Sequence, residues 1–382
     1  MHHLLDKYFS LVRKFIPAEQ KASAVGLDIG TGECKAVELN KTEAGYELLN
    51  WVIEPVHNGD VKASAQKIFS QLTASCQSLY TSVFGKGTLI RYIDMPRMSL
   101  EDLKSSFDIE ADKYFPFAQN QIYTDCFILD AKEKSKNMSV MAAAAKRELI
   151  DRRIKLLEEL GMPVEFVGLN PIVLANALSV LGEDITQPAA TPTIVDQKEK
   201  KEDNSGAKQE DAKKDKGVDT RSTVALLDMG ESVGNLTILV DHLPWFTRDI
   251  FIGGRDFTKS ISNALGISFQ EAEKLKRNPE GKQQEVALAC DTVIMNMVQE
   301  LRLSIDYFAT EKNREIDKLL ITGGASMLEG ITETFEKSLE IAVKTWNPVK
   351  LLRKAPGLAE EGLDRNSFKL GVALGLALYQ YD

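Results

Sequence analysis

Two stretches of the sequence decide the fold: AVGLDIGTG at residues 24–32, followed by AVEL at 36–39, and VALLDMG at 224–230, followed by LTIL at 236–239. Each stretch is an apolar run, an Asp-x-Gly turn and a second apolar run. Short apolar runs separated by glycine are typical of two strands joined by a tight hairpin. Asp28 and Asp228 occupy equivalent positions, and the same ungapped alignment matches Leu39 with Leu239. Internal similarity of this kind indicates a duplicated structural unit.

Helical and strand patterns alternate along the rest of the chain. Apolar periodicity bounded by Gly or Pro predicts helices at 146–160, 171–181, 269–277, 286–308 and 368–379. Buried strands are expected at 163–169 and 318–322, and the second of these leads directly into a Gly-Gly turn. Strands that alternate with helices in this way predict an α/β fold.

The composition excludes several classes of protein. Hydrophobic residues make up 43% of the 382 residues and charged residues 27%, which is typical of a soluble globular protein. The net charge is −9, whereas a nucleic-acid backbone attracts a basic surface. No apolar run approaches the roughly 18–20 residues that span a bilayer, and the N-terminus has no signal-peptide pattern. The four cysteines and four histidines lack zinc-ligand spacing. We therefore expect a cytoplasmic protein with no zinc site, no transmembrane span and no nucleic-acid partner.

Residues 186–222 separate the two similar halves. Between 196 and 219 the sequence places 7 Lys and 8 acidic residues in 24 positions, with no aromatic residue. Such a segment buries too little apolar area to offset its ordering entropy, so a disordered, nearly neutral linker is expected.

The two Asp-x-Gly hairpins have the chemistry of a phosphate clamp. Glycines tolerate positive φ and close approach, so that successive backbone N–H groups can point at phosphate oxygens. An Asp at the end of a strand repels phosphate but can hold Mg²⁺, directly or through water, and the metal then bridges to the phosphates. A third glycine turn at residues 321–326 adds to the pattern. Two hairpins facing each other across a cleft would hold a polyphosphate from both sides.

These motifs resemble those of the actin/Hsp70/sugar-kinase superfamily. The hairpins at 28–39 and 228–239 look like its two phosphate motifs, and LLITGGA at 319–325 looks like its adenosine motif. Within the superfamily the chain is most similar to the FtsA-like branch, and there to the PilM family of actin-like type IV pilus assembly proteins. The segments that carry this resemblance are 25–32, 35–39, 109–117, 167–171, 252–257 and 371–378. The resemblance implies an actin-like ATPase fold, with two duplicated RNase H-like lobes and an FtsA-type inserted small domain.

The resemblance also implies a role for each motif residue in binding ATP and Mg²⁺. Asp228 would organise the metal, with Asp28 acting through water. Glu273 and Lys276 resemble a ribose-contacting pair, with an exposed ion pair as the alternative. Lys35 would either reach a phosphate or lie on its strand as a solvated lysine. The small residues assigned to the nucleotide are Gly30, Thr31, Gly32, Gly230, Gly234, Gly253, Gly323, Gly324 and Ala325.

Hydrolysis depends on the residue that orients the attacking water. Actin-like ATPases usually place a Gln or Glu just past the returning strand of the first lobe, where this sequence has Asn170. An Asn amide orients a water but does not accept its proton. We therefore expect at most a slow ATPase, helped mainly by Mg²⁺ and backbone N–H groups.

The resemblance implies a protein partner as well. Residues 88–161 would form the inserted small domain, with a strand at 91–96 and a helix at 99–114 that Ser99 caps. In PilM-like proteins a groove between this domain and the first lobe holds the N-terminal tail of PilN, an inner-membrane protein. We therefore expect binding of a short peptide of a PilN-like protein. The resemblance also implies contacts with other components of the pilus platform or motor. The chain would be cytoplasmic, and its partners would hold it at the inner membrane as a peripheral protein. Homo-oligomer formation stays open.

The chain divides accordingly into six units. These are an N-terminal amphipathic helix (1–21), a first lobe (22–87 and 162–185), the inserted small domain (88–161), the disordered charged linker (186–222), a second lobe (223–250 and 316–382) and its helical subdomain (251–315). The N-terminal helix could pack on the first lobe, bind a partner helix or lie on a membrane surface. Its net charge of about +2 makes it a weak surface anchor.

Two other functions are open on the same fold. One is an FtsA-like filament-forming protein of cell division or the cytoskeleton. Such proteins usually finish with an amphipathic membrane helix, and this sequence has none after 368–379. The other is a small-molecule kinase, which needs a catalytic Asp beside a polar substrate pocket, and the sequence has no such motif.

Overall fold

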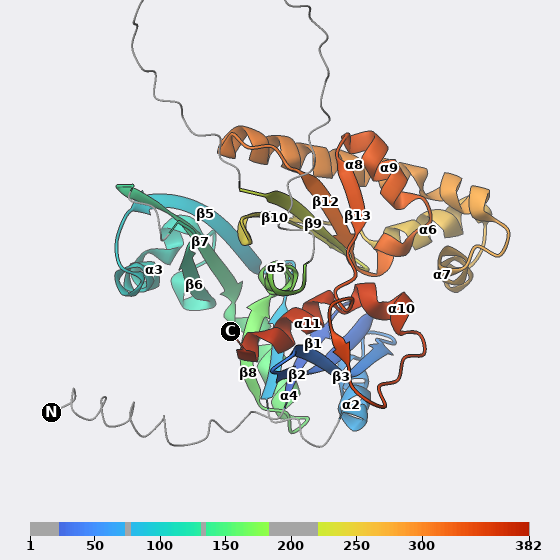
Figure 1. The fold of residues 1–382 in the computed structure, drawn as a ribbon, viewed down its shortest axis with the longest axis horizontal. Helices are drawn as coiled ribbons and strands as arrows, with labels where there is room; N and C mark the ends of the chain where they lie inside the picture. The colour runs from blue at the N-terminus through green and yellow to red at the C-terminus, as the bar shows by residue number, and fades with distance from the viewer. Residues whose placement is uncertain (1–22, 73–77, 131–134, 183–220, 382) are drawn as a thin grey trace, which may run out of the picture.

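A computed structural model describes residues 23–72, 78–130, 135–182 and 221–381. The predicted N-terminal helix and all but the last two residues of the predicted linker lie outside the described residues, so these two predictions are not addressed by the structure. The described elements form two large sheets with their helices and a third, smaller sheet (Figure 1).

Two mixed sheets repeat one strand order. The first contains β1 (Ala24–Ile29), β2 (Glu33–Thr42), β3 (Gly45–Pro55), β4 (Ser78–Val83), β8 (Val164–Leu169) and β14 (Arg353–Lys354), in the order β14-β3-β2-β1-β4-β8. The second contains β9 (Thr223–Met229), β10 (Gly234–Val240), β11 (Leu243–Ile250), β12 (Lys318–Thr322) and β13 (Ala342–Thr345), in the order β11-β10-β9-β12-β13. In both sheets an antiparallel meander of three strands is continued by parallel strands. The predicted duplication is confirmed.

The two hairpins at the start of these sheets share their register. Asp28 lies opposite Lys35 between β1 and β2, and Asp228 lies opposite Asn235 between β9 and β10. Both central strands are buried along almost their whole length. A strand covered on both faces needs apolar residues at successive positions, which explains the uninterrupted apolar runs before each Asp.

Helices cover both sheets. The helices outside the interface between the sheets are α2 (Val61–Gln71), α4 (Arg147–Glu158), α6 (Gly254–Leu265), α7 (Phe269–Arg277), α8 (Gln283–Lys312), α9 (Ile331–Leu339) and α10 (Leu363–Asn366). α7 has its predicted bounds because Ser268 and Glu271 form a capping box at its start. α8 extends beyond the predicted 286–308 at both ends. The expected helix at 368–379 is α11 (Gly371–Leu378), which is shorter because 3₁₀ turns flank it.

A third sheet lies in the predicted inserted domain. It contains β5 (Thr88–Pro96), β6 (Ile122–Ile128) and β7 (Asn137–Lys146), in the antiparallel order β5-β7-β6. α3 (Leu100–Tyr114) packs Leu103 and Phe107 into the core of this sheet. Ser99 caps α3 as predicted, because its Oγ accepts a hydrogen bond from the N–H of Asp102 at 3.1 Å.

The helix after the third sheet packs on the first lobe. Leu157 of α4 is fully buried in one cluster with Val25 and Leu27 of β1. The predicted inserted domain extends to residue 161, so α4 lies inside its sequence bounds while packing on the first sheet. The division of the chain into domains stays a prediction.

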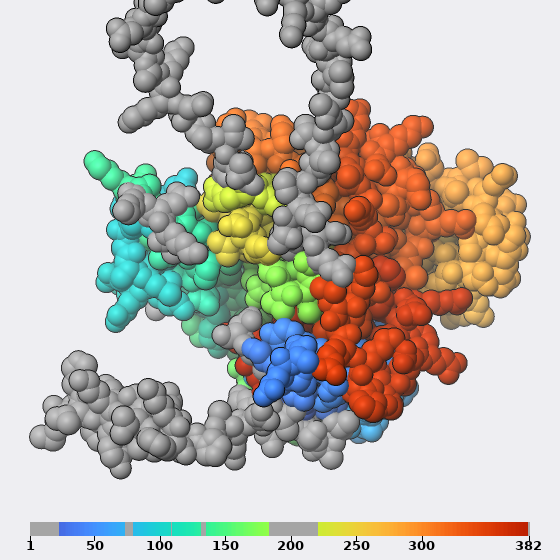
Figure 2. All heavy atoms as spheres, viewed as in Figure 1, coloured from blue at the N-terminus to red at the C-terminus, as the bar shows by residue number. Residues whose placement is uncertain are grey.

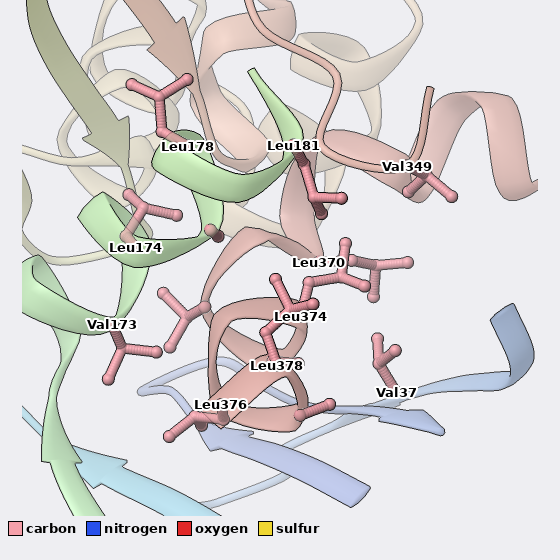
Figure 3. Close-up of a cluster of buried hydrophobic side chains, with 14 of the residues drawn as sticks. Val37, Val173, Leu174, Leu178, Leu181, Val349, Leu370, Leu374, Leu376 and Leu378 are labelled. Atoms are coloured by element: carbon pink, nitrogen blue, oxygen red, sulfur yellow. The ribbon is translucent and has the colours of Figure 1, made fainter. Parts of the chain in front are cut away.

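Two helices lie between the large sheets and join them (Figure 3). α5 (Asn170–Leu181) follows a strand of the first sheet yet packs on β10 and β11 of the second. α11 follows the second sheet in the chain yet packs on β1 and β2 of the first. One continuous apolar core therefore includes Leu39, Leu178, Leu226 and Leu374. Figure 2 shows the consequence at the surface, where red C-terminal residues lie beside blue N-terminal residues.

Glycine allows these backbones to approach each other closely. A β-carbon on Gly26 of β1 would overlap the carbonyl oxygen of Ala373 in α11. A β-carbon on Gly375 of α11 would overlap the carbonyl oxygen of Val173 in α5. A side chain at either position would push apart two backbones, which cannot turn aside as a flexible side chain could.

Gly375→Ala should therefore destabilise the protein by about 2–4 kcal/mol, because the α5–α11 contact must open to admit the methyl group. The control is Gly234→Ala, whose β-carbon would keep 3.5 Å from its nearest neighbour, the carbonyl oxygen of Ile252. Thermal unfolding followed by circular dichroism measures both variants. Equal midpoints for Gly375→Ala and Gly234→Ala would contradict the assigned contact.

Candidate functional site

The first hairpin buries a charged pair at its base. Asp28 is the last residue but one of β1, with 5% of its surface exposed, and the ammonium of Lys35 donates to its Oδ2 at 2.9 Å. Burial disfavours the charged ammonium, but the carboxylates of Asp28, Glu33 and Asp228 outweigh this and raise the pKa of Lys35. Lys35 is therefore not a solvated strand lysine. It neutralises Asp28 within the predicted site.

Asp228 occupies the equivalent place in the second hairpin. Burial raises the pKa of Asp228 to about 6, while the charge of Lys35 opposes this rise and that of Asp28 adds to it. The carboxylates of Asp28 and Asp228 thus act on each other and on one lysine between the two hairpins. The two hairpins face each other with their acidic residues inward.

The third glycine turn lies against Asp228. Gly323 has φ of +88°, and a β-carbon there would overlap Asp228 Oδ1 and lie 2.7 Å from the backbone nitrogen of Met229. Only glycine fits both constraints. The carbonyl oxygen of Phe368 accepts hydrogen bonds from Gly323 N at 2.8 Å and from Thr322 Oγ1 at 3.0 Å. The predicted adenosine residues, Gly323, Gly324 and Ala325, therefore follow β12 directly beside the second hairpin.

The tips of the two hairpins touch each other. Thr31 Oγ1 and Ser232 Oγ lie 2.9 Å apart. The carboxylate of Glu231 lies so close to Gly32 that a β-carbon on Gly32 would overlap it. The predicted first phosphate motif is thus in contact with the loop of the second.

The start of α6 supports the second hairpin from behind. Gly254 N donates to the carbonyl oxygen of Gly230 at 2.9 Å, and Arg255 N donates to that of Glu231 at 2.8 Å. A β-carbon on Gly253, the residue before α6, would lie 2.5 Å from the same Glu231 oxygen. Gly234 begins β10 opposite Met229. These backbone contacts fix the conformation of the loop that follows Gly230 in the second hairpin.

Glu273 and Lys276 form an ion pair at 2.7 Å, and it is largely buried. The Lys276 ammonium also donates to the Gly254 carbonyl oxygen at 2.9 Å and to Thr258 Oγ1 at 2.8 Å. The pair is therefore not an exposed one. It ties α7 to the start of α6, next to the second hairpin.

Three charged residues that the sequence analysis did not identify bridge the two lobes at the cleft. Lys369 donates to Glu33 Oε1 at 2.9 Å, and Arg277 reaches the same oxygen at 3.7 Å. Arg277 also donates to Glu273 at 2.8 Å. Arg277 could have been identified from the sequence, because it directly follows Lys276, which was predicted to contact the nucleotide. Glu33 and Lys369 are 336 positions apart, and no pattern in the sequence connects them.

Asn170 begins α5 and is buried, with 6% of its surface exposed. Its Oδ1 has no hydrogen-bond partner among the described residues, and the same is true of the buried Ser82 Oγ. Ser82 lies opposite Gly168, two residues before Asn170, so both polar atoms lie near the carboxyl edge of the first sheet. Buried polar atoms without a protein partner commonly bind water. This suits the predicted role of Asn170, which stays a prediction.

The carboxylates fit a magnesium ion that takes most of its ligands from elsewhere. Mg²⁺ is commonly held by one or two carboxylates together with waters and substrate phosphates. Asp28 and Asp228 supply such a pair. In the described part of the chain, no three His, Cys, Asp or Glu side chains come together as a complete metal site.

A cavity of about 420 Å³ lies between α8 and the turn that precedes α9. Ala287, Leu288, Leu328 and Gly330 are among its lining residues. None of the residues predicted for nucleotide binding lines this cavity. The lining residues that follow the glycine turn begin at Leu328, three residues after Ala325 in the chain.

The chain is similar to known proteins both in sequence and in structure. The model of the family described as type IV pilus assembly protein PilM matches residues 26–196 and 191–381. The chain belongs to this PilM family. Among solved structures, the PilM-PilN type IV pilus biogenesis complex is similar with a TM-score of 0.75 and 21% identity, covering 95% of this chain and 99% of that one. MreB 5 of Spiroplasma citri, solved with bound AMPPNP, is similar with a TM-score of 0.50 and 10% identity, covering 96% and 97%.

These likenesses confirm the expected actin-like ATPase fold for this PilM-family chain. They do so at low sequence identity, so they concern the arrangement of the sheets and helices. Across the described residues, no helix combines the length and the hydropathy that a bilayer span requires.

Asp228→Asn should make the folded protein more stable at neutral pH. The pKa of Asp228 rises from 3.8 to about 6 on folding, so the folded state binds this proton more tightly than the unfolded state does. The stability that protonation provides is present below pH 4 and is lost as the pH rises through 6. The variant should exceed the wild type by about 1–2 kcal/mol at pH 7.5 and lose that advantage near pH 4. Urea unfolding at both pH values measures the difference, and a pH-independent difference would contradict the assignment.

Proposed function

We propose that this PilM-family chain is a nucleotide-gated adaptor of type IV pilus assembly, with Mg²⁺–ATP held between its two lobes. The observation that carries the nucleotide half is that Asp28 and Asp228, at the ends of two hairpins in the same register, act on one lysine from opposite lobes. Membership of the family supports the pilus half.

Each part of the cleft would have one task. Asp228, and Asp28 through water, would hold Mg²⁺, which neutralises phosphate charge when it is bound. Backbone N–H groups around Gly30 and Gly230 would contact the phosphates. Gly323 to Ala325 would pack on the adenosine, and the Glu273–Lys276 pair would contact the ribose. Because these residues come from both lobes, a bound nucleotide would favour the closed arrangement of the lobes.

Turnover would be slow at most. Asn170 would orient a water at the carboxyl edge of the first sheet, but its amide cannot act as a general base. Asp28 is not available as a base either, since its carboxylate is paired with Lys35. The chain would therefore work mainly through the conformation that the nucleotide selects.

Asp228→Asn should weaken the binding of Mg²⁺–ATP by about ten-fold or more, because a ligand of the metal is lost. Calorimetric titration of the full chain with ATP, in Mg²⁺ and in EDTA, measures this effect, which should shrink in EDTA. Glu361→Gln, which makes the same change of charge at an exposed residue between β14 and α10, is the control. No binding by the wild type would remove the nucleotide half of the proposal, and unchanged affinity of Asp228→Asn would remove the metal role.

The partner in this proposal is the N-terminal tail of a PilN-like inner-membrane protein, which would recruit the chain to the membrane from the cytoplasm. Support comes from the solved PilM-PilN complex, which shares this fold. The tail would lie between the third sheet and the first lobe. There β6 is an edge strand among the described strands, and an extended peptide can add to such an edge.

Side chains of suitable chemistry lie at this edge. Lys104 of α3 pairs with Asp125 of β6 at 3.0 Å, and Tyr379, just past α11, lies within electrostatic reach of the same lysine. Phe127 and Tyr379 are exposed aromatic residues, with 47% and 43% of their surfaces accessible. Exposed aromatic side chains beside a charged pair are typical of a peptide-binding surface.

Phe127→Ala should weaken binding of a synthetic peptide with the N-terminal sequence of the PilN-like protein by about ten-fold, because an aromatic anchor is removed. Fluorescence anisotropy with the labelled peptide measures the affinity. Ile109→Ala removes another exposed apolar side chain, on a different face of α3 from Lys104, and should leave binding unchanged. Equal losses in both variants would argue against this surface.

A further inference from the structure

One acidic side chain lies where the proposed site needs open space. Glu231 follows Gly230 in the second hairpin, and its carboxylate lies against Gly32 of the first hairpin. Together with Gly30 and Thr31, Gly32 belongs to the first phosphate motif, which the resemblance assigns to the terminal phosphates of the nucleotide. A carboxylate in this place carries negative charge and oxygen acceptors, as a terminal phosphate does, although its charge is smaller.

The lysines near the site are each paired with a carboxylate, whereas Asp228 has no ion-pair partner among the described residues. Lys35 is bound to Asp28, Lys276 to Glu273, and Lys369 to Glu33. Arg277 lies between Glu273 and Glu33 and is also within electrostatic reach of Glu231. Among the described residues, no cation lies within ion-pair distance of the Glu231 carboxylate, and its side chain is exposed. Glu231 is thus the acidic residue of the 230–233 loop, and only the more distant Arg277 acts on its charge.

The loop holds Glu231 at Gly32 through contacts on both sides of it. Ser232, the next residue, meets Thr31 at 2.9 Å across the cleft. The carbonyl oxygen of Glu231 accepts a hydrogen bond from Arg255 N at 2.8 Å, which fixes its backbone to α6. The backbone is therefore held while the exposed side chain is free to rotate. A rotation of this side chain would uncover Gly32 without moving either hairpin.

We propose that Glu231 determines which nucleotide the cleft accepts, favouring a nucleoside diphosphate over a triphosphate. This inference rests on the nucleotide site proposed above. A diphosphate leaves the position at Gly32 to the carboxylate. A triphosphate would bring a further negative phosphate toward Gly32, where the Glu231 carboxylate would repel it unless the side chain turned away into solvent. The chain would then close on ATP only when the ATP-to-ADP ratio is high.

The test compares Mg²⁺–ATP with Mg²⁺–ADP by calorimetric titration of the full-length wild type, E231Q and the charge-matched control E361Q. The glutamine keeps the shape of the side chain and removes its charge. The ATP-to-ADP affinity ratio should rise about ten-fold in E231Q and stay unchanged in E361Q, since a nearby like charge at a partly solvated site has an effect of this order. Thermal unfolding of each variant checks that the exposed substitution leaves the fold intact.

Three results would overturn the proposal, and they differ from one another. If wild type and E231Q bind both nucleotides with the same ratio, Glu231 does not set the preference although the nucleotide site stands. If E231Q loses affinity for Mg²⁺–ATP, the carboxylate helps to hold the metal instead of repelling the phosphate. If no variant binds either nucleotide, the proposed function fails together with the inference.

Discussion

The packing of α5 against α11 is the contact on which the rest of the structure depends. Each helix covers the sheet of the opposite half of the chain, so neither sheet has a complete core without the other half. Gly375 brings the two helix backbones together, and Gly26 brings α11 onto β1. The strands that end in Asp28 and Asp228 are those beside this packing. The carboxylates therefore face each other because an apolar core holds their strands in place, against their own repulsion.

The polar edge of the cleft is built differently from this core. There the lobes meet through ion pairs such as Glu33 with Lys369 and through the hydroxyl contact of Thr31 with Ser232. The Glu33–Lys369 pair is largely buried, and such a pair gives little net stabilisation because the desolvation of both charges offsets their attraction, whereas a buried apolar interface stabilises in proportion to its area. The edge can therefore open at small cost while the α5–α11 core stays closed. A site between two lobes needs this combination, since the ligand must enter and the lobes must still be one unit.

The sequence predicted those features that arise from local pattern or repetition. These features depend on residues that are close together in the chain: the two hairpins, the duplicated sheets, the bounds of α7 and the cap at Ser99. The bridge from Glu33 to Lys369 and the seat of Glu231 on Gly32 depend on how two distant segments meet, which no local pattern encodes. Strands β6 and β7 were not predicted, because apolar and polar residues alternate only weakly in them. β7, for example, carries a run of alanines on both faces. The ion pair of Lys35 with Asp28 was not predicted, because Asp28 is its neighbour across a hairpin and not along the strand, and the phosphate role of Lys35 stays a prediction.

The third sheet is placed to respond to the lobes. On one side it continues into α4, where Arg153 donates to the carbonyl oxygen of Ser82 at 2.6 Å and lies within electrostatic reach of Asp28. On the other side its strand β5 lies beside β11 of the second lobe, with Tyr92 next to Thr247. The third sheet thus contacts both lobes, behind the first hairpin and at the edge of the second sheet. Any rotation of one lobe relative to the other must shift at least one of these contacts, because close-packed interfaces move between discrete arrangements and do not deform continuously. If the proposed nucleotide rotates the lobes, these contacts would carry the change to the third sheet.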